Sequence, residues 1–194
     1  MGYHHQFRAK WHDYNDGLYF ITICCDKHRH FFGQIANGSM TLSAVGSIVE
    51  KCLCAIPEHF PDAEVWNYVV MPNHVHMVLN IRADKRPSDS EPLSNNLGFL
   101  KPKEHDNEET SNFHYNTRLS IIINQFKSSV SREARCHNSK FKWQSKFHDH
   151  IILGPVAFEK IMNYIYNNVE NWTYDRFNEN HSDFSEAPWN RNPQ

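Results

Sequence analysis

The sequence lacks any hydrophobic run long enough to cross a membrane. Its apolar stretches, such as Tyr19–Cys25, are far shorter than the ~20 residues that a transmembrane helix needs. The beginning of the chain, MGYHHQFRAKWHDY, contains no apolar segment of the kind found in secretory signals, and Gln6 makes Gly2 a poor myristoylation site. We therefore expect a protein with no membrane partner.

The sequence also lacks a disulfide framework. Its cysteines are odd in number and irregular in spacing: Cys24, Cys25, Cys52, Cys54 and Cys136. This pattern excludes the small disulfide-rich scaffolds and predicts reduced thiols in the cytoplasm. Cys52 and Cys54 fall in a predicted helix, where side chains two positions apart diverge, so packing explains the pair better than a zinc site does.

An excess of one charge is missing as well, because the formal net charge is −2. Total charge therefore does not indicate a nucleic-acid-binding protein. Residues 116–153, however, contain seven basic and two acidic side chains, a local charge of +5. Such a block can bind phosphates, with Lys127, Arg132 and Lys146 as candidate contacts. A solvated helix face balanced by acidic neighbours explains these charges equally well.

Length and composition predict one domain. The chain has 194 residues, of which 40% are hydrophobic, so it can form a substantial core, and nothing in it repeats. Residues 82–115 are rich in Pro, Ser, Asn, Glu and Lys and poor in large apolar side chains. We interpret this stretch as a flexible insertion in a single domain that spans residues 1–194, with a C-terminal tail from about residue 174.

Apolar periodicity predicts three helices and four strands. The expected order is a strand at 17–25, a helix at about 42–59 capped by Thr41, a hairpin at 65–81, a helix at about 117–136, a strand ending at 153, and a helix at about 156–172. This order predicts an α+β fold. The expected architecture is a ferredoxin-like split βαβ sandwich, with a four-stranded mainly antiparallel sheet and helices on one face.

The predicted hairpin includes the stretch that organises the site, VWNYVVMPNHVHMVLN at residues 65–80. Two runs rich in β-branched and aromatic residues flank the polar corner Met71–Asn73. In the second run, His74 and His76 lie two residues apart, so both imidazoles leave the same face of the strand. Two imidazoles on one face supply half the ligands of a divalent metal site. Two histidines on a solvated sheet face are an equally good interpretation of this pattern alone.

The last predicted helix places Tyr164 and Asn168 four residues apart, on the same face. The Asn168 carbonyl oxygen can act as a third metal ligand beside two imidazoles, which leaves coordination positions for a phosphate. Tyr166 lies about 200° round the helix and cannot share that face. A half-buried aromatic side chain with a hydrated hydroxyl is the alternative role of Tyr164.

Several motifs together resemble one known family. Met71–Asn73 followed by His74–His76 is similar to the HUH motif of single-tyrosine transposases, and in particular of REP-associated tyrosine transposases. Trp143–Gln144, Phe147 and His150–Ile152 resemble the signature that precedes the catalytic helix in that family. The motifs occur in the family's order and cover most of residues 17–172, apart from the insertion.

The resemblance implies a role for each site residue. Tyr164 matches the nucleophile and Asn168 the third ligand, beside His74 and His76, of a site that holds Mg²⁺ or Mn²⁺. The family often has proline after this asparagine, whereas Val169 stands here, so we expect the helix to continue.

The implied function is DNA transposition. Tyr164 would cut single-stranded or hairpin DNA of defined sequence through a covalent 5′-phosphotyrosine that a 3′-hydroxyl later rejoins. His150 would contact DNA, move protons or simply pack in its strand. The resemblance leaves open a monomer or a homodimer that exchanges the tyrosine helix.

Two other functions fit the residues. One is a module that binds single-stranded nucleic acid without chemistry, including a domesticated transposase that has lost catalysis. The other is a metal-dependent phosphodiester hydrolase, in which water attacks and Tyr164 is structural. A covalent adduct distinguishes the transesterase from both, and a hydrolase would keep its activity in Tyr164→Phe.

Overall fold

The computed structural model describes residue 9, residues 12–85 and residues 117–179. Most of the predicted insertion at 82–115, and the tail beyond residue 179, lie outside the described residues. None of the helices in the described ranges combines the length and the apolar character that a membrane span requires. The elements below all belong to these ranges.

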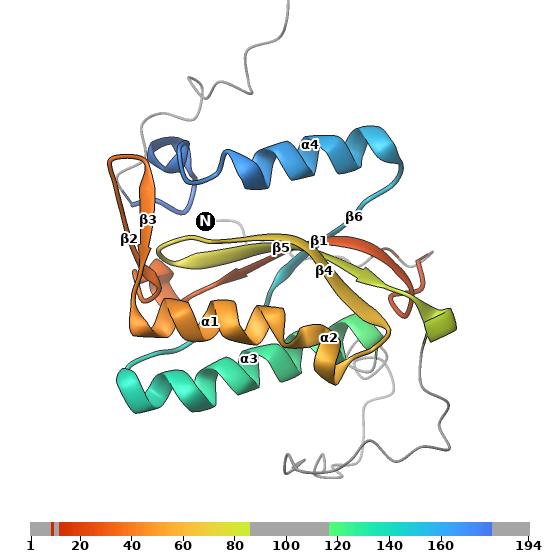
Figure 1. Cartoon of the computed structure of the whole chain (residues 1–194), viewed down its shortest axis with the longest axis horizontal. Helices are drawn as coiled ribbons and strands as arrows, with labels where there is room; N and C mark the ends of the chain where they lie inside the picture. Colours follow the sequence, from red (N-terminus) through yellow and green to blue (C-terminus); the bar gives the residue numbers. More distant parts are fainter. Residues whose placement is uncertain (1–8, 10–11, 86–116, 180–194) are drawn as a thin grey trace, which may run out of the picture.

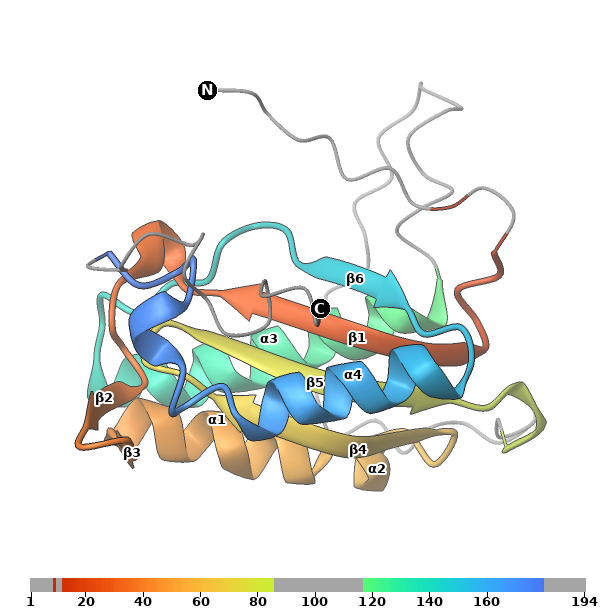
Figure 2. The same ribbon diagram turned by 90° about the horizontal axis from the view of Figure 1, so that it is seen from above.

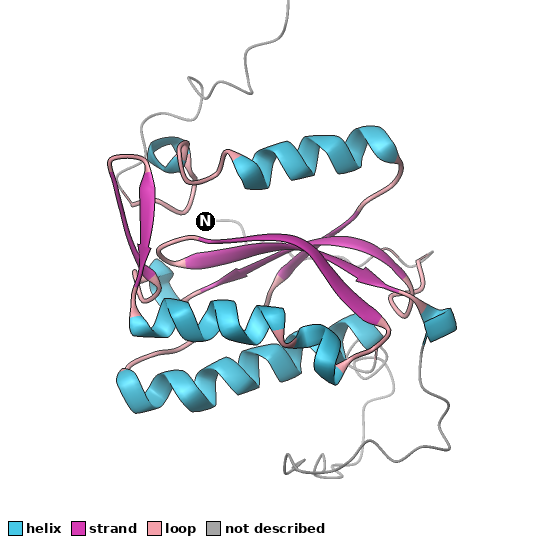
Figure 3. Ribbon diagram, viewed as in Figure 1, coloured by secondary structure: helices cyan, strands magenta, loops and turns pink. Residues whose placement is uncertain are grey.

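A four-stranded antiparallel sheet forms the centre of the fold (Figures 1 and 3). Its strand order is β4 (Ala63–Val70), β5 (His74–Ile81), β1 (Gly17–Cys24) and β6 (His148–Ile151). All three strand pairs are antiparallel. Helices connect β1 to β4 and β5 to β6, so the predicted α+β class and split βαβ topology are confirmed.

One face of the sheet is covered by α1 (Ala44–Cys54), α2 (Ile56–His59) and α3 (Arg118–His137), as Figure 1 shows. The side chains that join these helices to the sheet are apolar and fully buried, and they include Val75, Met77 and Leu79 of β5. They alternate along the strand, as the period of two requires. The other set of β5 side chains, which contains the histidines, therefore points to the opposite face.

The expectation that all helices lie on one face is wrong for α4 (Pro155–Tyr166), which covers the second face (Figures 1 and 2). Seven of the eight residues of β5 are buried, so this strand needs cover on both sides. Apolar side chains of the second face, including Phe20 and Val78, pack against Phe158, Ile161 and Ile165 of α4. A third layer thus encloses the histidine face.

Two local features differ from the sequence-based prediction. Residues before the first helix form a hairpin, β2 (Gly33–Ala36) and β3 (Ser39–Leu42), so that helix begins after Ser43 rather than Thr41. The Ser43 side chain accepts a hydrogen bond from the Gly46 backbone amide, which is an ordinary helix cap. The helix also breaks at Ala55, just before Pro57, because proline cannot donate the backbone hydrogen bond that a continuing helix needs.

The last helix ends at Tyr166, six residues earlier than predicted. At this end, both the backbone amide and the side-chain amide of Asn167 donate to the Asn163 carbonyl, at 3.1 and 2.8 Å. Asparagine is also a poor helix former because it competes for backbone groups in this way. Asn168 consequently lies in a turn beyond the helix, followed by the short 3₁₀ helix η4 (Trp172–Tyr174).

Candidate metal and tyrosine site

Both histidines of β5 project from the same side of the sheet, toward α4. Their Nε2 atoms lie 3.1 Å apart. His74 is 0% exposed and His76 is 2% exposed, so the alternative of two histidines on a solvated sheet face does not hold. The alternation along the strand was sufficient to predict that the two imidazoles lie side by side. Their burial comes from α4 and from the C-terminal segment, residues 167–179, whose Trp172 and Phe177 rings pack on His74.

Each imidazole is held through its second nitrogen. Nδ1 of His74 lies 2.8 Å from Oδ1 of Asn73, and Nδ1 of His76 lies 2.8 Å from Oγ1 of Thr22. Thr22 is the β1 residue directly opposite His76 in the strand register. Partners of this kind orient metal-binding imidazoles in proteins. They leave both Nε2 atoms directed into one small volume.

Tyr164 reaches this volume from the facing helix. Its hydroxyl oxygen lies 3.2 Å from Nε2 of His76, and its ring packs edge-on against Phe20 and His76. Tyr166, the competing tyrosine, is 84% exposed and points away. Tyr164 and Tyr166 therefore lie on different faces of α4, as their spacing predicts.

Asn168 lies in the same site although it is outside the helix. Its side chain is 3% exposed and makes a hydrogen bond with Tyr164. Its Oδ1 atom is buried without a hydrogen-bond partner among the residues that the structure describes. A buried carbonyl oxygen of this kind is costly unless another group occupies the space before it. The predicted third ligand thus contacts Tyr164, whose hydroxyl lies beside His76.

Asp175 is a site residue that the sequence analysis missed. Its Oδ2 atom lies 3.7 Å from Nε2 of His74, and it is 5% exposed. Ligand atoms of His74, His76 and Asp175 all fall within 4.8 Å of one another, so these three residues can hold a metal ion. A single aspartate in a polar tail has no spacing signal. Aromatic contacts bring it here, because the rings of Trp172 and Phe177 pack 6.2 and 4.7 Å from that of His74.

The donor set fits a divalent cation. Two nitrogens bound at about 2.1 Å in neighbouring coordination positions lie about 3.0–3.4 Å apart, which includes the separation of the two Nε2 atoms. The carboxylate of Asp175 adds an oxygen donor, and Asn168, which contacts Tyr164, holds a buried Oδ1 with no hydrogen-bond partner among the described residues. Mixed imidazole and oxygen ligands suit first-row divalent ions.

Burial sets the protonation states in the site. It lowers the pKa of His76 to about 3, with a further contribution from the positive charge of Arg176. Burial, followed by the neighbouring His76, lowers the pKa of His74 well below its usual value. Both imidazoles are therefore neutral, as a metal ligand must be. Burial and the charge of Asp175 raise the pKa of Tyr164 to about 12, against the opposing effects of Asn168 and Arg176.

Acid is expected to destabilise the metal-free protein through these imidazoles. In the unfolded chain a histidine takes up a proton below about pH 6.5, whereas in the folded protein His76 does so only near pH 3. The free energy of unfolding therefore falls as the pH drops from about 6.5 to about 3. Each histidine contributes a slope of up to about 1.4 kcal/mol per pH unit. Urea unfolding between about pH 7 and about pH 5 measures the slope. His76→Gln should flatten this slope relative to the wild type; an unchanged slope in His76→Gln would contradict the assignment.

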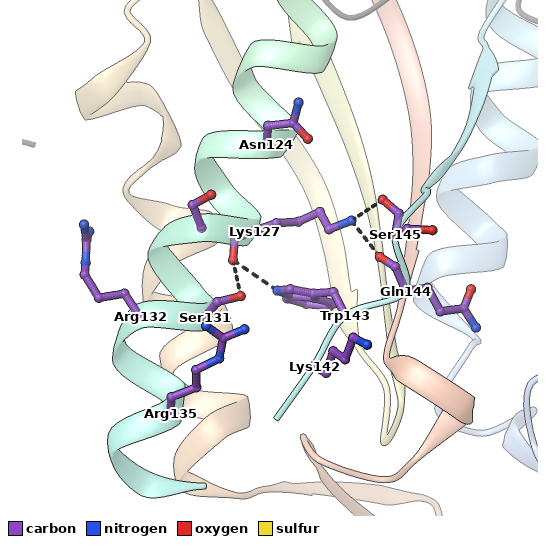
Figure 4. Close-up of a pocket in the computed structure, with 10 residues that line it drawn as sticks. Asn124, Lys127, Ser131, Arg132, Arg135, Lys142, Trp143, Gln144 and Ser145 are labelled. Atoms are coloured by element: carbon purple, nitrogen blue, oxygen red, sulfur yellow. Dashed lines mark hydrogen bonds between the residues drawn. The ribbon is translucent and has the colours of Figure 1, made fainter. Parts of the chain in front are cut away.

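The predicted DNA contacts lie outside this site. Lys127 donates hydrogen bonds to the backbone carbonyls of Gln144 and Ser145 at 2.8 and 3.0 Å, which fastens the segment before β6 to α3 (Figure 4). Arg132 is exposed on α3 and lines a groove between α3 and the segment before β6. Lys146 is exposed just beyond Ser145. His150 is exposed on β6, opposite Phe20 in the strand register. Its side chain therefore points from the same face of the sheet as Phe20, the face that α4 covers.

Arg176 is a second missed residue. It is exposed beside Asp175, and its guanidinium lies 4.6 Å from the centre of the Phe177 ring. Its positive charge acts on the pKa values of His74, His76 and Tyr164. A cation at this position can attract an anionic group to the tyrosine hydroxyl.

A bacterial relative places the chain in a family. An uncharacterized protein of Haemophilus influenzae (strain ATCC 51907 / DSM 11121 / KW20 / Rd) is 32% identical over 179 residues, which cover 90% of this chain and 94% of the relative. The chain belongs to the family of that protein. No family model matches the sequence.

Two solved structures resemble the chain distantly. A REP-associated tyrosine transposase bound to a REP hairpin has a TM-score of 0.48 and 13% identity, over 89% of this chain and 74% of its own. A provisionally assigned transposase from Deinococcus radiodurans has a TM-score of 0.41 and 13% identity, over 86% of this chain and 97% of its own. Both TM-scores lie below 0.5, which is too low for either structure to assign a function here.

Proposed function

We propose that this family member is a metal-dependent DNA strand transesterase of the transposase type, with Tyr164 as its nucleophile. The observation that carries the proposal is the position of the Tyr164 hydroxyl, 3.2 Å from Nε2 of His76 within a buried set of metal-type ligands. The order of the histidine, Trp-Gln and tyrosine motifs, which resembles that of the REP-associated transposases, supports it further.

The reaction is a balanced exchange of phosphodiester bonds. The Tyr164 oxygen attacks phosphorus, the bond between phosphorus and the 3′ oxygen breaks, and that oxygen leaves with a proton as a free 3′-hydroxyl. A 3′-hydroxyl then attacks the 5′-phosphotyrosine, which releases Tyr164 and rejoins a strand. His74 and His76, with an oxygen donor from Asn168 or Asp175, would hold Mg²⁺ or Mn²⁺, which would supply charge stabilisation at the phosphate. Two imidazoles favour Mn²⁺ in affinity.

The tyrosine must lose its proton to react. Its pKa of about 12 reflects burial and the nearby carboxylate of Asp175. Arg176 and the Asn168 side chain favour the phenolate, and a cation held at Asp175 would offset the repulsion from that carboxylate. These three residues therefore act on the nucleophile by adjusting its ionisation.

Access for DNA requires a rearrangement. The two imidazoles are at most 2% exposed beneath the segment that contains Trp172 and Phe177. Tyr164 is partly exposed, whereas a phosphate can approach the buried imidazoles only when this segment moves aside. Single-stranded or hairpin DNA suits such a site because its backbone is locally free of a complementary strand.

The basic groove is the proposed contact for DNA outside the scissile phosphate. It has a volume of about 650 Å³ and is lined by the cations Lys127, Arg132, Arg135 and Lys142 together with serine hydroxyls and amides (Figure 4). None of the described residues that line it is acidic. Because Lys127 already binds two carbonyls, the exposed side chains Arg132, Arg135 and Lys142 are better placed to meet phosphates.

Removing one cation from this groove is expected to weaken DNA binding in a salt-dependent way. Arg132→Ala should reduce the slope of log K against log salt by about 1, because one fewer counterion is released on binding. Fluorescence anisotropy with a hairpin oligonucleotide at several salt concentrations measures this slope. Lys85→Ala removes the same charge from η2 (Ala83–Lys85), a short 3₁₀ helix that follows β5 and lies outside the groove, and it serves as the control. An equal change in both variants would mean that the groove makes no specific contribution.

A covalent adduct tests the function itself. The protein is incubated with labelled hairpin-bearing single-stranded DNA from the flanks of its own gene, with Mn²⁺ or Mg²⁺, and run on a denaturing gel. A metal-dependent shifted band is the expected result. Cleavage to a free 5′-phosphate without an adduct would indicate a hydrolase, and binding without cleavage would indicate an inactive DNA-binding protein.

A further inference from the structure

We propose that Asn73 is a positioning residue that fixes which nitrogen of His74 carries a proton and ties this choice to the C-terminal segment. The inference rests on the metal-binding role of His74 in the proposed function. It concerns a neutral tautomer, so it can be examined in the metal-free protein without DNA.

The orientation of the Asn73 amide is determined by its surroundings. Its Nδ2 atom donates to two backbone carbonyls, those of His28 at 3.0 Å and Phe177 at 2.7 Å. Carbonyl oxygens only accept, so the amide nitrogen must face them. The Oδ1 atom therefore faces Nδ1 of His74 at 2.8 Å. An amide oxygen carries no hydrogen, which means that His74 must donate from Nδ1.

This hydrogen bond leaves Nε2 of neutral His74 with its lone pair directed into the site. Nε2 is the atom that lies 3.1 Å from His76 and 3.7 Å from Asp175. The metal-binding form of His74 is thus already present before any ion arrives. Such preorganisation is what partners of metal-ligating histidines contribute in other proteins.

The backbone around Asn73 keeps the amide in place. Asn73 is 0% exposed, and its carbonyl accepts a hydrogen bond from the Cys25 backbone amide at 2.8 Å. The carbonyl of His28 comes from a short segment in which Lys27 and His28 both have left-handed φ angles, 55° and 51°. Non-glycine residues adopt this conformation only when the surroundings hold them in it. The acceptor for Asn73 is therefore built into a constrained loop.

His76 differs from His74 in this respect. Its Nδ1 atom faces the Thr22 hydroxyl, which can either donate or accept a hydrogen bond. In the metal-free protein, Nε2 of His76 can therefore carry the hydrogen that bridges the 3.1 Å gap to His74. We infer that His74 keeps one tautomer throughout, while His76 moves its proton to Nδ1 when an ion binds and Thr22 becomes the acceptor.

Nuclear magnetic resonance of ¹⁵N-labelled wild-type protein tests the tautomers directly. Long-range ¹H–¹⁵N spectra distinguish the two neutral forms of each histidine. The expected result is an Nδ1-protonated His74 both without metal and with Zn²⁺ as a diamagnetic probe, and a His76 that changes form on Zn²⁺ addition. An Nε2-protonated His74 in the metal-free protein would overturn the proposal, whether or not the protein forms a DNA adduct.

Two variants separate positioning from simple structural support. Asn73→Asp still accepts from Nδ1 of His74 but cannot donate to His28 and Phe177, whereas Asn73→Leu can do neither. Mn²⁺ titration by calorimetry should show near wild-type affinity for the aspartate variant and about a 10–100-fold loss for the leucine variant. Hydrogen exchange of residues 172–179 should increase in both. Equal losses of Mn²⁺ affinity in the two folded variants would show that Asn73 acts only as a structural link.

Discussion

Tyr164→Phe is expected to abolish the covalent protein–DNA adduct and to lower strand cleavage by about 10³-fold or more, because phenylalanine offers no oxygen to attack phosphorus. The ring packs against Phe20 and His76, and phenylalanine keeps these contacts. The fold and the DNA affinity should therefore remain close to those of the wild type. A denaturing gel with labelled hairpin DNA, together with an anisotropy titration, measures both properties.

Tyr166→Phe is the matched control for this experiment. It makes the same chemical change two residues away, at a side chain that is 84% exposed and outside the site. This variant should form the adduct at the wild-type rate. If Tyr164→Phe still cleaved DNA at that rate, Tyr164 would be a packing residue and water the attacking group.

His74→Ala is expected to eliminate stabilisation of the protein by Mn²⁺. An ion at about 100 times its dissociation constant stabilises the folded state by about 2.7 kcal/mol, which raises the melting temperature of a protein of this size by about 5–10 °C. The wild type should show a shift of this order in differential scanning calorimetry. Without His74, the ion loses a neutral imidazole ligand from a fully buried site, and the shift should disappear.

His150→Ala provides the control, because it removes an exposed imidazole of β6 and should retain the full Mn²⁺-dependent shift. Asn168→Ala and Asp175→Ala extend the comparison to the oxygen donors. The variant with the larger loss identifies the third ligand, since the buried Asn168 oxygen has no hydrogen-bond partner in the described part of the chain and Asp175 holds a carboxylate near His74. A shift that survives in His74→Ala would place the ion elsewhere.

The sequence by itself determined those parts of the site that depend on spacing within one element. Alternation along a strand puts His74 and His76 on one face, and helical spacing separates Tyr164 from Tyr166. The order of apolar segments was likewise sufficient to predict the antiparallel sheet and its two crossover helices. These features follow from the repeat of the strand or helix backbone, so the residues of one short segment are enough to predict them.

The tertiary structure alone decided which face α4 covers and which residues complete the site. The helix α4 ends at Tyr166, and Asn168 stays near Tyr164 although it no longer belongs to the helix that was expected to align them. Asp175 reaches His74 because aromatic rings dock the C-terminal segment on β5. Contacts between segments about a hundred residues apart depend on the packing of the whole core, and no periodicity in the sequence encodes them.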